Sequence, residues 1–317
     1  MFLLHPFKSV KAILGAIEGR LWAIEGRLGS LEAAQQRLEA RAEYLQEALG
    51  RVESRQLAVL GSLNVAENEF RVFSQWGEDG IIQFLLRHVE IENKVFVEFG
   101  VEDYTEANTR FLLVNNNWAG LVLDSSGDNI AKVKNGRLHW LYDLKAVQAF
   151  VTRDNINDIL RENGVVGEIG LLSIDIDGND YWIWRAIEVV SPVVVAIEYN
   201  HRFGKDAAVT VPYEETFDRR KSPRPWIYFG ASLRALCLLA ERKGYAFVGC
   251  NSNGVNAFFV RRDKMPRELR ELTPAEGFVE GHFSELRDES GVQIKALAEE
   301  ERRLVMSLPL TNVEEIE

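Results

Sequence analysis

The chain has 317 residues, of which 46% are hydrophobic and 27% are charged, and its formal net charge is −11. That length gives room for one large domain or two smaller ones with a buried core. The acidic balance argues against a nucleic-acid-binding protein, which normally has a basic surface, and a glycan or another small molecule fits better as a partner. The two cysteines, Cys237 and Cys250, are too few for a disulfide framework or a conventional zinc site. We expect both to be reduced in a cytoplasmic protein.

The N-terminal stretch MFLLHPFKSVKAIL is apolar but interrupted. A histidine, a proline and two lysines break any signal-peptide core, and nothing reaches the ~20 apolar residues of a membrane span. The stretch would suit an interfacial helix that makes weak peripheral contact with a membrane. We favour the alternative, in which it covers the end of a helical bundle. Its apolar members are Phe2, Leu3, Leu4, Phe7, Val10, Ile13 and Leu14.

Apolar residues recur at steps of four and three from Val10 to Leu63, which predicts a long helix with about seven heptad repeats. Positions a and d of this seam begin with Leu14, Ile17, Leu21, Ile24, Leu28 and Leu31. Position e holds Glu18, Glu25, Glu32, Glu39 and Glu53, and position g holds Arg20, Arg27, Arg41 and Arg55. Because g faces e of a neighbouring helix when the helices run parallel, these charges favour a parallel coiled coil.

The residue types at the seam also indicate the number of chains. Leucine at a with isoleucine at d favours more than two strands, and Gln35 and Gln56 at a set the register at a cost in stability. We expect the chain to bind copies of itself as a trimer, with a tetramer or a dimer as alternatives. A single helix lying on its own domain is the other interpretation, which we disfavour because so long a seam needs a partner.

After the seam, a polar turn precedes an amphipathic helix, and two predicted strands follow. The turn contains Ser74, Gln75, Gly77, Glu78 and Asp79, and helix capping explains these residue types. The first strand, KVFVEFG, ends at Glu98 and Gly100 and leads into a helix from about Thr105, and the second, AGLVLDSS, ends at Asp124. In nucleotide-binding α/β folds, an acid ~20 residues after such a glycine turn holds the ribose hydroxyls. A single glycine replaces the dinucleotide fingerprint, so a nicotinamide or flavin cofactor loses support.

The third strand has two candidates, LHWLYDL and AVQAFV. The second is followed by TRDNINDIL, in which Asn155 or Asn157 starts a helix and residues 152–155 lie at the rim of the sheet.

The stretch from Gly170 to Asn200 predicts two buried parallel strands joined by a helix. In open parallel sheets, ligands bind beyond the carboxyl ends of the strands. Those ends carry Asp175, Asp177, Asp180, Glu198 and Asn200. Four carboxylates together repel one another unless a cation or proton sharing relieves them. Asp180 suits a helix cap, and we expect about half of these four carboxylates to contact a ligand.

The rest of the chain predicts a lid and an antiparallel hairpin. Residues 201–232 form a long loop with three prolines, and its aromatic residues indicate an ordered lid or substrate wall. A helix follows and ends at Gly244, before a hairpin around Asn253-Gly254. These patterns divide the chain into a coiled-coil arm over residues 1–64, an α/β domain over 65–263, and a helical extension with a loose acidic tail over 264–317.

The motifs SQxGED at Ser74, VFVEFG, Asp124, IDIDGNDYWIW and IEYN together resemble the FkbM-type family of class I, S-adenosylmethionine-dependent methyltransferases. The resemblance covers residues 70–262. It implies a Rossmann-like, seven-stranded α/β sheet with helices on both faces and the last strand antiparallel. It also implies O-methylation of a hydroxyl on a sugar or surface-glycan precursor.

Carried over to this chain, the resemblance implies that Glu98 and Gly100 flank the methionine moiety, that Asp124 holds the ribose, and that residues 152–155, with Asp154 and Asn155, hold the adenine. Gln75, Glu78 and Ser125 are further candidates for cofactor contact. Asp175 and Asp177 would line the reaction site, with Asp175 also contacting the cofactor.

Methyl transfer to an alcohol requires an aligned oxygen, carbon and sulfur and a group that removes the hydroxyl proton. His201 is one candidate base, although a lone histidine is more often structural. Alternatively, Mg²⁺ or Mn²⁺ bound by Asp177, Glu198 and Asn200 would polarise the hydroxyl, as in the catechol-type O-methyltransferases that this acid arrangement resembles. Two rival functions use other chemistry: a metal-dependent hydroxylase or hydrolase on the same fold, and a non-catalytic scaffold with a ligand-binding domain.

Overall fold

The computed structural model describes residues 5–222, 226–288 and 290–316. The chain divides into two compact units, Met1–Leu49 and Gly50–Glu317. The first unit consists, in its described part, of the long helix α1 (His5–Leu60), whose last turns belong to the second unit. Leu14, Leu21 and Leu28 of the predicted seam are 54%, 53% and 54% exposed, so the long helix is present and its apolar seam faces solvent in the single chain. Of the apolar N-terminal residues expected to cover the end of a helical bundle or to contact a membrane, Phe2, Leu3 and Leu4 lie outside the described part.

The last turns of α1 are anchored in the second unit by close packing. A Cβ on Gly50 would lie 2.4 Å from Cγ2 of Val72, so only glycine allows this approach. Leu57 packs against the small cluster of Phe70, Val72, Phe73 and Phe111. The second unit therefore begins before residue 65, where the sequence placed its start.

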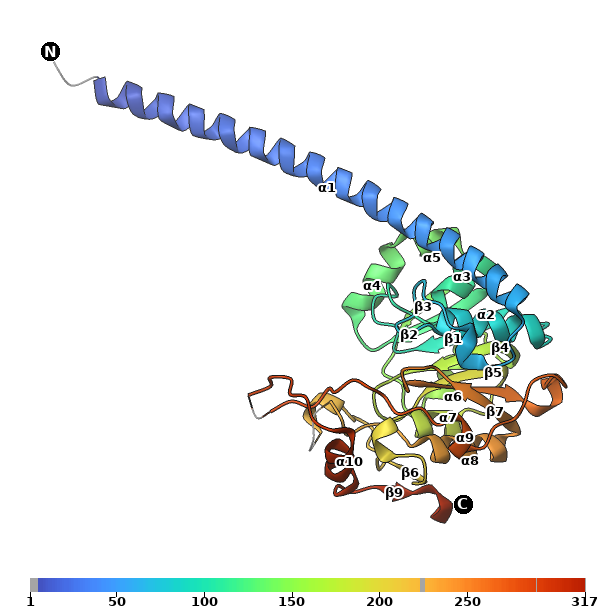
Figure 1. Ribbon diagram of the computed structural model, residues 1–317. Helices are drawn as coiled ribbons and strands as arrows, with labels where there is room; N and C mark the ends of the chain where they lie inside the picture. Colours follow the sequence, from blue (N-terminus) through green and yellow to red (C-terminus); the bar gives the residue numbers. More distant parts are fainter. Residues whose placement is uncertain (1–4, 223–225, 289, 317) are drawn as a thin grey trace. The chain divides into compact units, whose positions relative to one another are not determined.

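A seven-stranded sheet forms the centre of the second unit (Figure 1). Its strands are β1 (Val95–Phe99), β2 (Ala119–Asp124), β3 (Leu144–Gln148), β4 (Gly167–Ile174), β5 (Val190–Glu198), β7 (Tyr245–Cys250) and β8 (Asn256–Arg261). Their spatial order is β3-β2-β1-β4-β5-β8-β7. The first five strands are parallel, and β8 runs antiparallel to both β5 and β7. The predicted Rossmann-like sheet with a terminal antiparallel hairpin is confirmed.

Both faces of the sheet are buried. Alternate side chains of one strand belong to different apolar clusters, with Val97 and Phe99 in one and Phe96 in the other. Helices on the two faces complete these clusters, as expected for a parallel sheet whose strands are apolar throughout. The helices are α2 (Glu78–His88), α3 (Arg110–Asn116), α4 (Gly127–Asn135), α5 (Arg137–Leu141), α6 (Ile156–Glu162), α7 (Asp180–Ala186) and α8 (Leu233–Lys243).

The structure differs from the sequence expectations at β3 and in the C-terminal region. Strand β3 takes residues from both candidate segments. Beyond β8 the described chain is mostly irregular, and its α-helices there are short: α9 (Pro274–Gly277) and α10 (Ala298–Met306). The expected loose tail is instead ordered, since β9 (Thr311–Asn312) pairs with β6 (Val209–Thr210) and Val313 is fully buried. Buried apolar contacts hold this segment on the domain.

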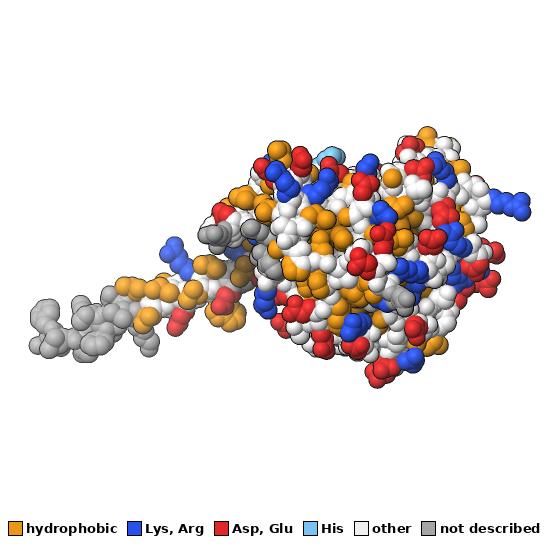
Figure 2. Space-filling model, turned by 90° about the horizontal axis from the view of Figure 1, so that it is seen from below, with side chains coloured by type: hydrophobic (Ala, Val, Ile, Leu, Met, Phe, Trp, Pro, Cys, Tyr) orange, Lys and Arg blue, Asp and Glu red, His pale blue; other side chains and the backbone are white. Residues whose placement is uncertain are grey.

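The surface carries charges of both signs. On the face that Figure 2 presents, acidic, basic and apolar side chains alternate, and the described surface in this view has no extended basic area. Within the described residues, every helix is too short or too polar to cross a membrane.

Candidate active site at the carboxyl edge

The strand order reverses between β1 and β4, and the loops after these two strands meet. Gly100 follows β1 with φ +73°, a left-handed conformation that favours glycine. A Cβ at this position would lie 1.7 Å from the carbonyl oxygen of Asp175, which follows β4. Any side chain here would therefore displace the β4 loop. The reversal point is where open α/β sheets bind ligands, and Gly100 and Asp175 are both located there.

Asp124 ends β2, and its carboxylate bonds the loop after β1 and the loop after β2 near the reversal point of the sheet. Its Oδ2 accepts a hydrogen bond from the backbone N–H of Glu102 (2.9 Å), and its Oδ1 accepts one from the N–H of Ser126 (2.7 Å). A carboxylate has about four acceptor positions. The half-buried Asp124 therefore retains capacity for a pair of ligand hydroxyls.

Glu98 lies one strand over but is engaged in internal contacts. Its Oε1 accepts hydrogen bonds from the N–H of Asn108 (2.9 Å) and the hydroxyl of Ser173 (3.2 Å). Its Oε2 accepts from the N–H (3.1 Å) and the hydroxyl (2.5 Å) of Thr109. Burial raises the pKa of Glu98, while these donors favour its charged form. Glu98 thus fixes the start of α3, and it shapes the site by positioning that loop.

The acids of the first motif are also internal. Oδ2 of Asp79 accepts hydrogen bonds from the N–H groups of Val72, Phe73 and Ser74 at 2.8, 2.7 and 2.8 Å. Oε1 of Glu78 accepts from the side-chain amides of Asn251 (2.7 Å) and Asn256 (2.9 Å) in the β7–β8 hairpin. The structure therefore places the Glu78 carboxylate in a buried network. Gln75 of the same motif is exposed.

The predicted adenine-side residues lie at the rim beyond β3. Asn155 accepts from the N–H of Thr152 (2.8 Å) and donates to the carbonyl oxygen of Phe150 (2.9 Å), so its amide closes the turn before α6. The side chain of Asp154 is 74% exposed, and Ser125 beyond β2 is exposed as well. Phe150 is 50% exposed at this rim and is an aromatic surface that the sequence did not single out.

Asp175, Asp177 and Glu198 form what we call the acid cluster. Each offers one carboxylate oxygen, and these oxygens all lie within 4.8 Å of one another. Oε2 of Glu198 is buried and has no hydrogen-bond partner among the described residues. Burial raises the pKa values of Asp175 and Glu198 well above their usual range, and repulsion from neighbouring carboxylates raises them further. These two acids therefore hold a proton or require a cation.

Asp180 and Asn200, the other two residues predicted at these strand ends, lie outside the acid cluster. Asp180 accepts hydrogen bonds from the N–H groups of Ile176 and Gly178, both at 2.9 Å, and begins α7. Asn200 donates to the carbonyl oxygens of Ile227 (2.9 Å) and Phe229 (3.0 Å) and accepts from the N–H of Arg202 (3.1 Å). The amide of Asn200 therefore holds the lid, and Asp175 occupies the place in the cluster that we predicted for Asn200.

His201 lies beneath the C-terminal segment. It is 2% exposed, and a Cβ on Gly281 would lie 2.6 Å from its Nε2. Burial lowers the pKa of His201 to about 3, and the positive charges of Arg202 and Arg302 add to this effect. Both ring nitrogens are buried without a hydrogen-bond partner among the described residues. The ring is neutral and enclosed by protein, which favours a structural role.

Residues 211–222 and 226–230, the described part of the long loop that we call the lid, lie on the loop that carries Asp175, Asp177 and Asp180. The side-chain amide of Asn179 donates to the carbonyl oxygen of Glu214 (2.8 Å), and the backbone N–H of Gly230 donates to the carbonyl oxygen of Gly178 (3.1 Å). A Cβ on Gly178 would lie 2.2 Å from Cδ1 of Phe217, so this glycine admits the aromatic ring. The lid is therefore fastened directly to the loop that carries the acids.

The C-terminal segment, residues 278–288, forms a wall that the sequence analysis missed. The ring of Phe283 stacks on Trp76 of the first motif, with ring centres 5.6 Å apart. Glu285 accepts a hydrogen bond from Arg219 of the lid (3.2 Å) and another from Arg202 (3.4 Å). No pattern marks these residues as part of a site. The basic run Arg219–Lys221 in an acidic chain was the signal that could have identified Arg219.

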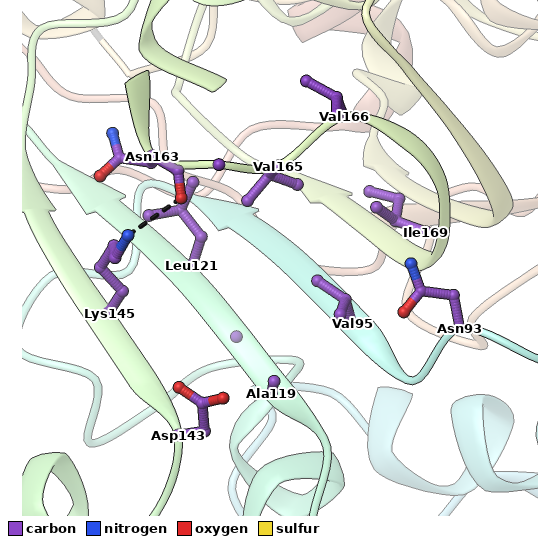
Figure 3. Close-up of a pocket in the computed structure, with 12 residues that line it drawn as sticks. Asn93, Val95, Ala119, Leu121, Asp143, Lys145, Asn163, Val165, Val166 and Ile169 are labelled. Carbon is purple, nitrogen blue, oxygen red and sulfur yellow. Dashed lines mark hydrogen bonds between the residues drawn. The ribbon is translucent and has the colours of Figure 1, made fainter. Parts of the chain in front are cut away.

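A separate pocket of about 200 Å³ opens at the opposite, amino edge of the sheet (Figure 3). It is lined in part by Val95, Ala119, Lys145, Asn163 and Ile169. Lys145 donates to the carbonyl oxygen of Asn163 (2.9 Å), drawn as the dashed line in Figure 3. The acid cluster lies beyond the other ends of these strands, so we assign this pocket no part in the chemistry.

Comparison with known proteins gives only distant similarities. No protein-family model matches the sequence. No curated protein matches it. Among solved structures, an S-adenosylmethionine-dependent methyltransferase from Clostridium acetobutylicum is 10% identical over 58% of this chain and 89% of that chain, with a TM-score of 0.37. The N-terminal domain of EvdMO1, solved in the presence of S-adenosylhomocysteine and D-fucose, is 11% identical over 67% of this chain and 96% of that chain (TM-score 0.38).

A third structure, the plantazolicin methyltransferase BamL in complex with S-adenosylhomocysteine, is 11% identical over 58% of this chain and 84% of that chain, also with a TM-score of 0.38. At this distance the assignment of an α/β, Rossmann-like fold rests on the strand order of the chain itself.

Proposed function

We propose that the protein is an S-adenosylmethionine-dependent O-methyltransferase that acts on a hydroxyl of a sugar or surface-glycan precursor, and that it is of the FkbM type. The observation that carries the proposal is the reversal point of the sheet, where Gly100, Asp124 and the acid cluster adjoin. A sulfonium cation requires nearby anionic groups, and the cluster supplies them.

The residues present fit this cosubstrate. Asp124 would accept hydrogen bonds from the ribose hydroxyls, and the close approach of Gly100 to the carbonyl oxygen of Asp175 would hold together the two loops that flank the methionine moiety. The rim around Phe150 would support the adenine through an aromatic surface. Glu98 would act indirectly, by holding the start of α3 through Thr109.

In the reaction, the acceptor oxygen forms a bond to the methyl carbon while the carbon–sulfur bond breaks and its electron pair passes to sulfur. The hydroxyl proton passes to a carboxylate. Asp177 is the best-placed acceptor for this proton because its side chain is 55% exposed, whereas Asp175 and Glu198 are more deeply buried. A divalent cation, when bound, would be held by Asp175, Asp177 and Glu198 and would lower the proton affinity of the hydroxyl.

Methyl transfer itself distinguishes the three candidate functions. The protein would be incubated with methyl-labelled S-adenosylmethionine and a panel of sugars, nucleotide sugars and glycan precursors, and products would be identified by mass spectrometry. A methylated acceptor supports the proposal. Consumption of an acceptor without methylation would indicate the hydroxylase or hydrolase, and cosubstrate binding without turnover of any acceptor would indicate the scaffold.

We further propose that the N-terminal unit associates as a parallel coiled coil, with a trimer preferred. The exposed seam of α1 supports this. Analytical ultracentrifugation should compare the full chain with a chain that begins at Gly50, which retains the helical turns packed on Val72. An oligomeric full chain and a monomeric shorter chain are expected, and two monomers would contradict the proposal.

A further inference from the structure

Arg219 places a positive charge at the acid cluster. It lies on a single helical turn of the lid (Arg219–Lys221), and its side chain is 15% exposed. Nη1 lies 2.7 Å from Oδ1 of Asp177, and Nη2 donates to Oε1 of Glu285 (3.2 Å). Its guanidinium carbon lies 5.2 Å from the ring centre of Trp226 and 5.0 Å from that of Phe229. Acids and aromatic rings therefore hold the guanidinium in one position.

This single charge does not balance the cluster. Three carboxylates converge there, and the Glu198 side chain is 9% exposed, with Oε2 lacking a partner among the described residues. A buried carboxylate oxygen without a donor is costly, so a further cation or a shared proton is required. The arrangement fits a cation site of which Arg219 fills one part.

We propose that the acid cluster is a cation-binding site whose built-in occupant is Arg219, and that a divalent cation binds there in competition with Arg219 for Asp177. The proposal rests on the same acids as the proposed function, but it makes no use of S-adenosylmethionine. The cation-site proposal can therefore be wrong while the proposed function is right, and the reverse.

Competition follows from charge and from the position of Glu285. A guanidinium and a divalent cation on the same carboxylate repel each other, and partial burial weakens the screening of that repulsion. Glu285 already accepts a hydrogen bond from Nη2 of Arg219, so the guanidinium remains paired when it leaves Asp177. Displacement of Arg219 thus requires the loss of one ion pair, and it removes one of several contacts between the lid and the loop that carries Asp177.

The test is Mn²⁺ binding to the purified, metal-free full chain, followed by electron paramagnetic resonance. Arg219→Gln removes the competitor, and we expect it to bind Mn²⁺ at least about tenfold more tightly than the wild type. Arg220→Gln is the matched control, because Arg220 is the next residue, carries the same charge and pairs with Asp218. Its Mn²⁺ affinity should stay within about twofold of the wild type, which corrects for the general effect of one lost charge.

Glu285→Gln keeps Arg219 and removes its alternative partner, so it should bind Mn²⁺ more weakly than the wild type by at least about twofold. This opposite shift supports the proposal even where Arg219→Gln is too unstable to purify. The proposal is overturned if Arg219→Gln binds Mn²⁺ no more tightly than Arg220→Gln, or if Glu285→Gln binds it as tightly as the wild type. Absence of Mn²⁺ binding from both the wild type and Arg219→Gln overturns the cation site itself, and calorimetric titration of S-adenosylmethionine on the same samples then reports separately on the proposed function.

Discussion

Two acid-rich motifs, at residues 74–79 and 174–180, differ in what their carboxylates contact. In the first, Asp79 and Glu78 accept hydrogen bonds from backbone N–H groups and asparagine amides. In the second, Asp175 lies with Asp177 and Glu198 in a cluster where an oxygen of Glu198 has no donor among the described residues. Oδ1 of Asp79 also lacks a partner among the described residues, but four donors converge on its Oδ2, whereas three carboxylates of the second set face one another. The contrast separates acids that stabilise the fold from acids available for chemistry.

The largest effect should follow from removing a partnered acid. Asp79→Ala leaves three buried backbone N–H groups and the hydroxyl of Ser74 without their acceptor. The relief of a buried charge offsets part of this cost, and we expect a loss of ~3–5 kcal/mol in the free energy of unfolding. Urea denaturation measures it. Asp79→Asn retains one acceptor oxygen and should lose less, while a fully stable Asp79→Ala protein would contradict the structural assignment.

Removing an acid of the cluster should lower turnover without lowering stability. Glu198→Gln relieves repulsion within the cluster, and its amide can donate to the neighbouring carboxylates, so stability should be equal to or higher than that of the wild type. Turnover should fall by about a hundredfold, or ~3 kcal/mol, because the charge on the reacting groups is lost. The comparison between the two motifs fails if Glu198→Gln unfolds readily and retains full turnover.

Asp124→Ala tests an acid with both kinds of role. The substitution should weaken binding of S-adenosylmethionine by ~1.5–3 kcal/mol, the range for charge-assisted hydrogen bonds. Some loss of stability should accompany it, since Asp124 also holds the N–H groups of Glu102 and Ser126. Calorimetry on the folded variant decides the matter, and an unchanged dissociation constant would rule out Asp124 as the ribose acid.

The contribution of His201 to the free energy of unfolding should depend on pH. Its pKa is about 3 in the folded chain and about 6.5 when unfolded, so the unfolded state binds the extra proton between these values. Its contribution to stability is therefore present above pH 6.5 and is lost as pH falls, by ~2 kcal/mol between pH 7 and pH 5. His201→Leu should lack this component, whereas the exposed neighbour His282→Leu should retain it. Identical pH dependence in the two variants would contradict the buried, neutral assignment.

Much of the fold could be predicted from the sequence because local patterns determine it. The apolar runs ending at Phe99, Asp124, Ile174 and Glu198 indicate buried parallel strands, and the heptad spacing indicates a long helix. Both patterns depend on neighbouring residues only. The C-terminal segment was harder, because its position depends on distant contacts such as the stacking of Phe283 on Trp76.

The site was predictable as a location and less so residue by residue. The carboxyl ends of the strands indicated where polar residues would gather, and Asp175, Asp177 and Glu198 do gather there. The sequence could not tell which acids would find partners within the protein. Asn200 and Asp180 have the same residue types as metal ligands, yet the donors and acceptors around them come from the lid and from the turn before α7. Arg219 lies more than 40 residues from Asp177 in the chain, and only tertiary structure brings them together.

The central claim, that the carboxyl edge of this sheet binds S-adenosylmethionine, is tested most directly by calorimetric titration of the full chain with S-adenosylhomocysteine. We predict saturable binding at one site per chain, with a negative heat-capacity change from burial of the adenosyl group, and competition by S-adenosylmethionine. A folded protein that takes up neither compound at millimolar concentration would contradict the account.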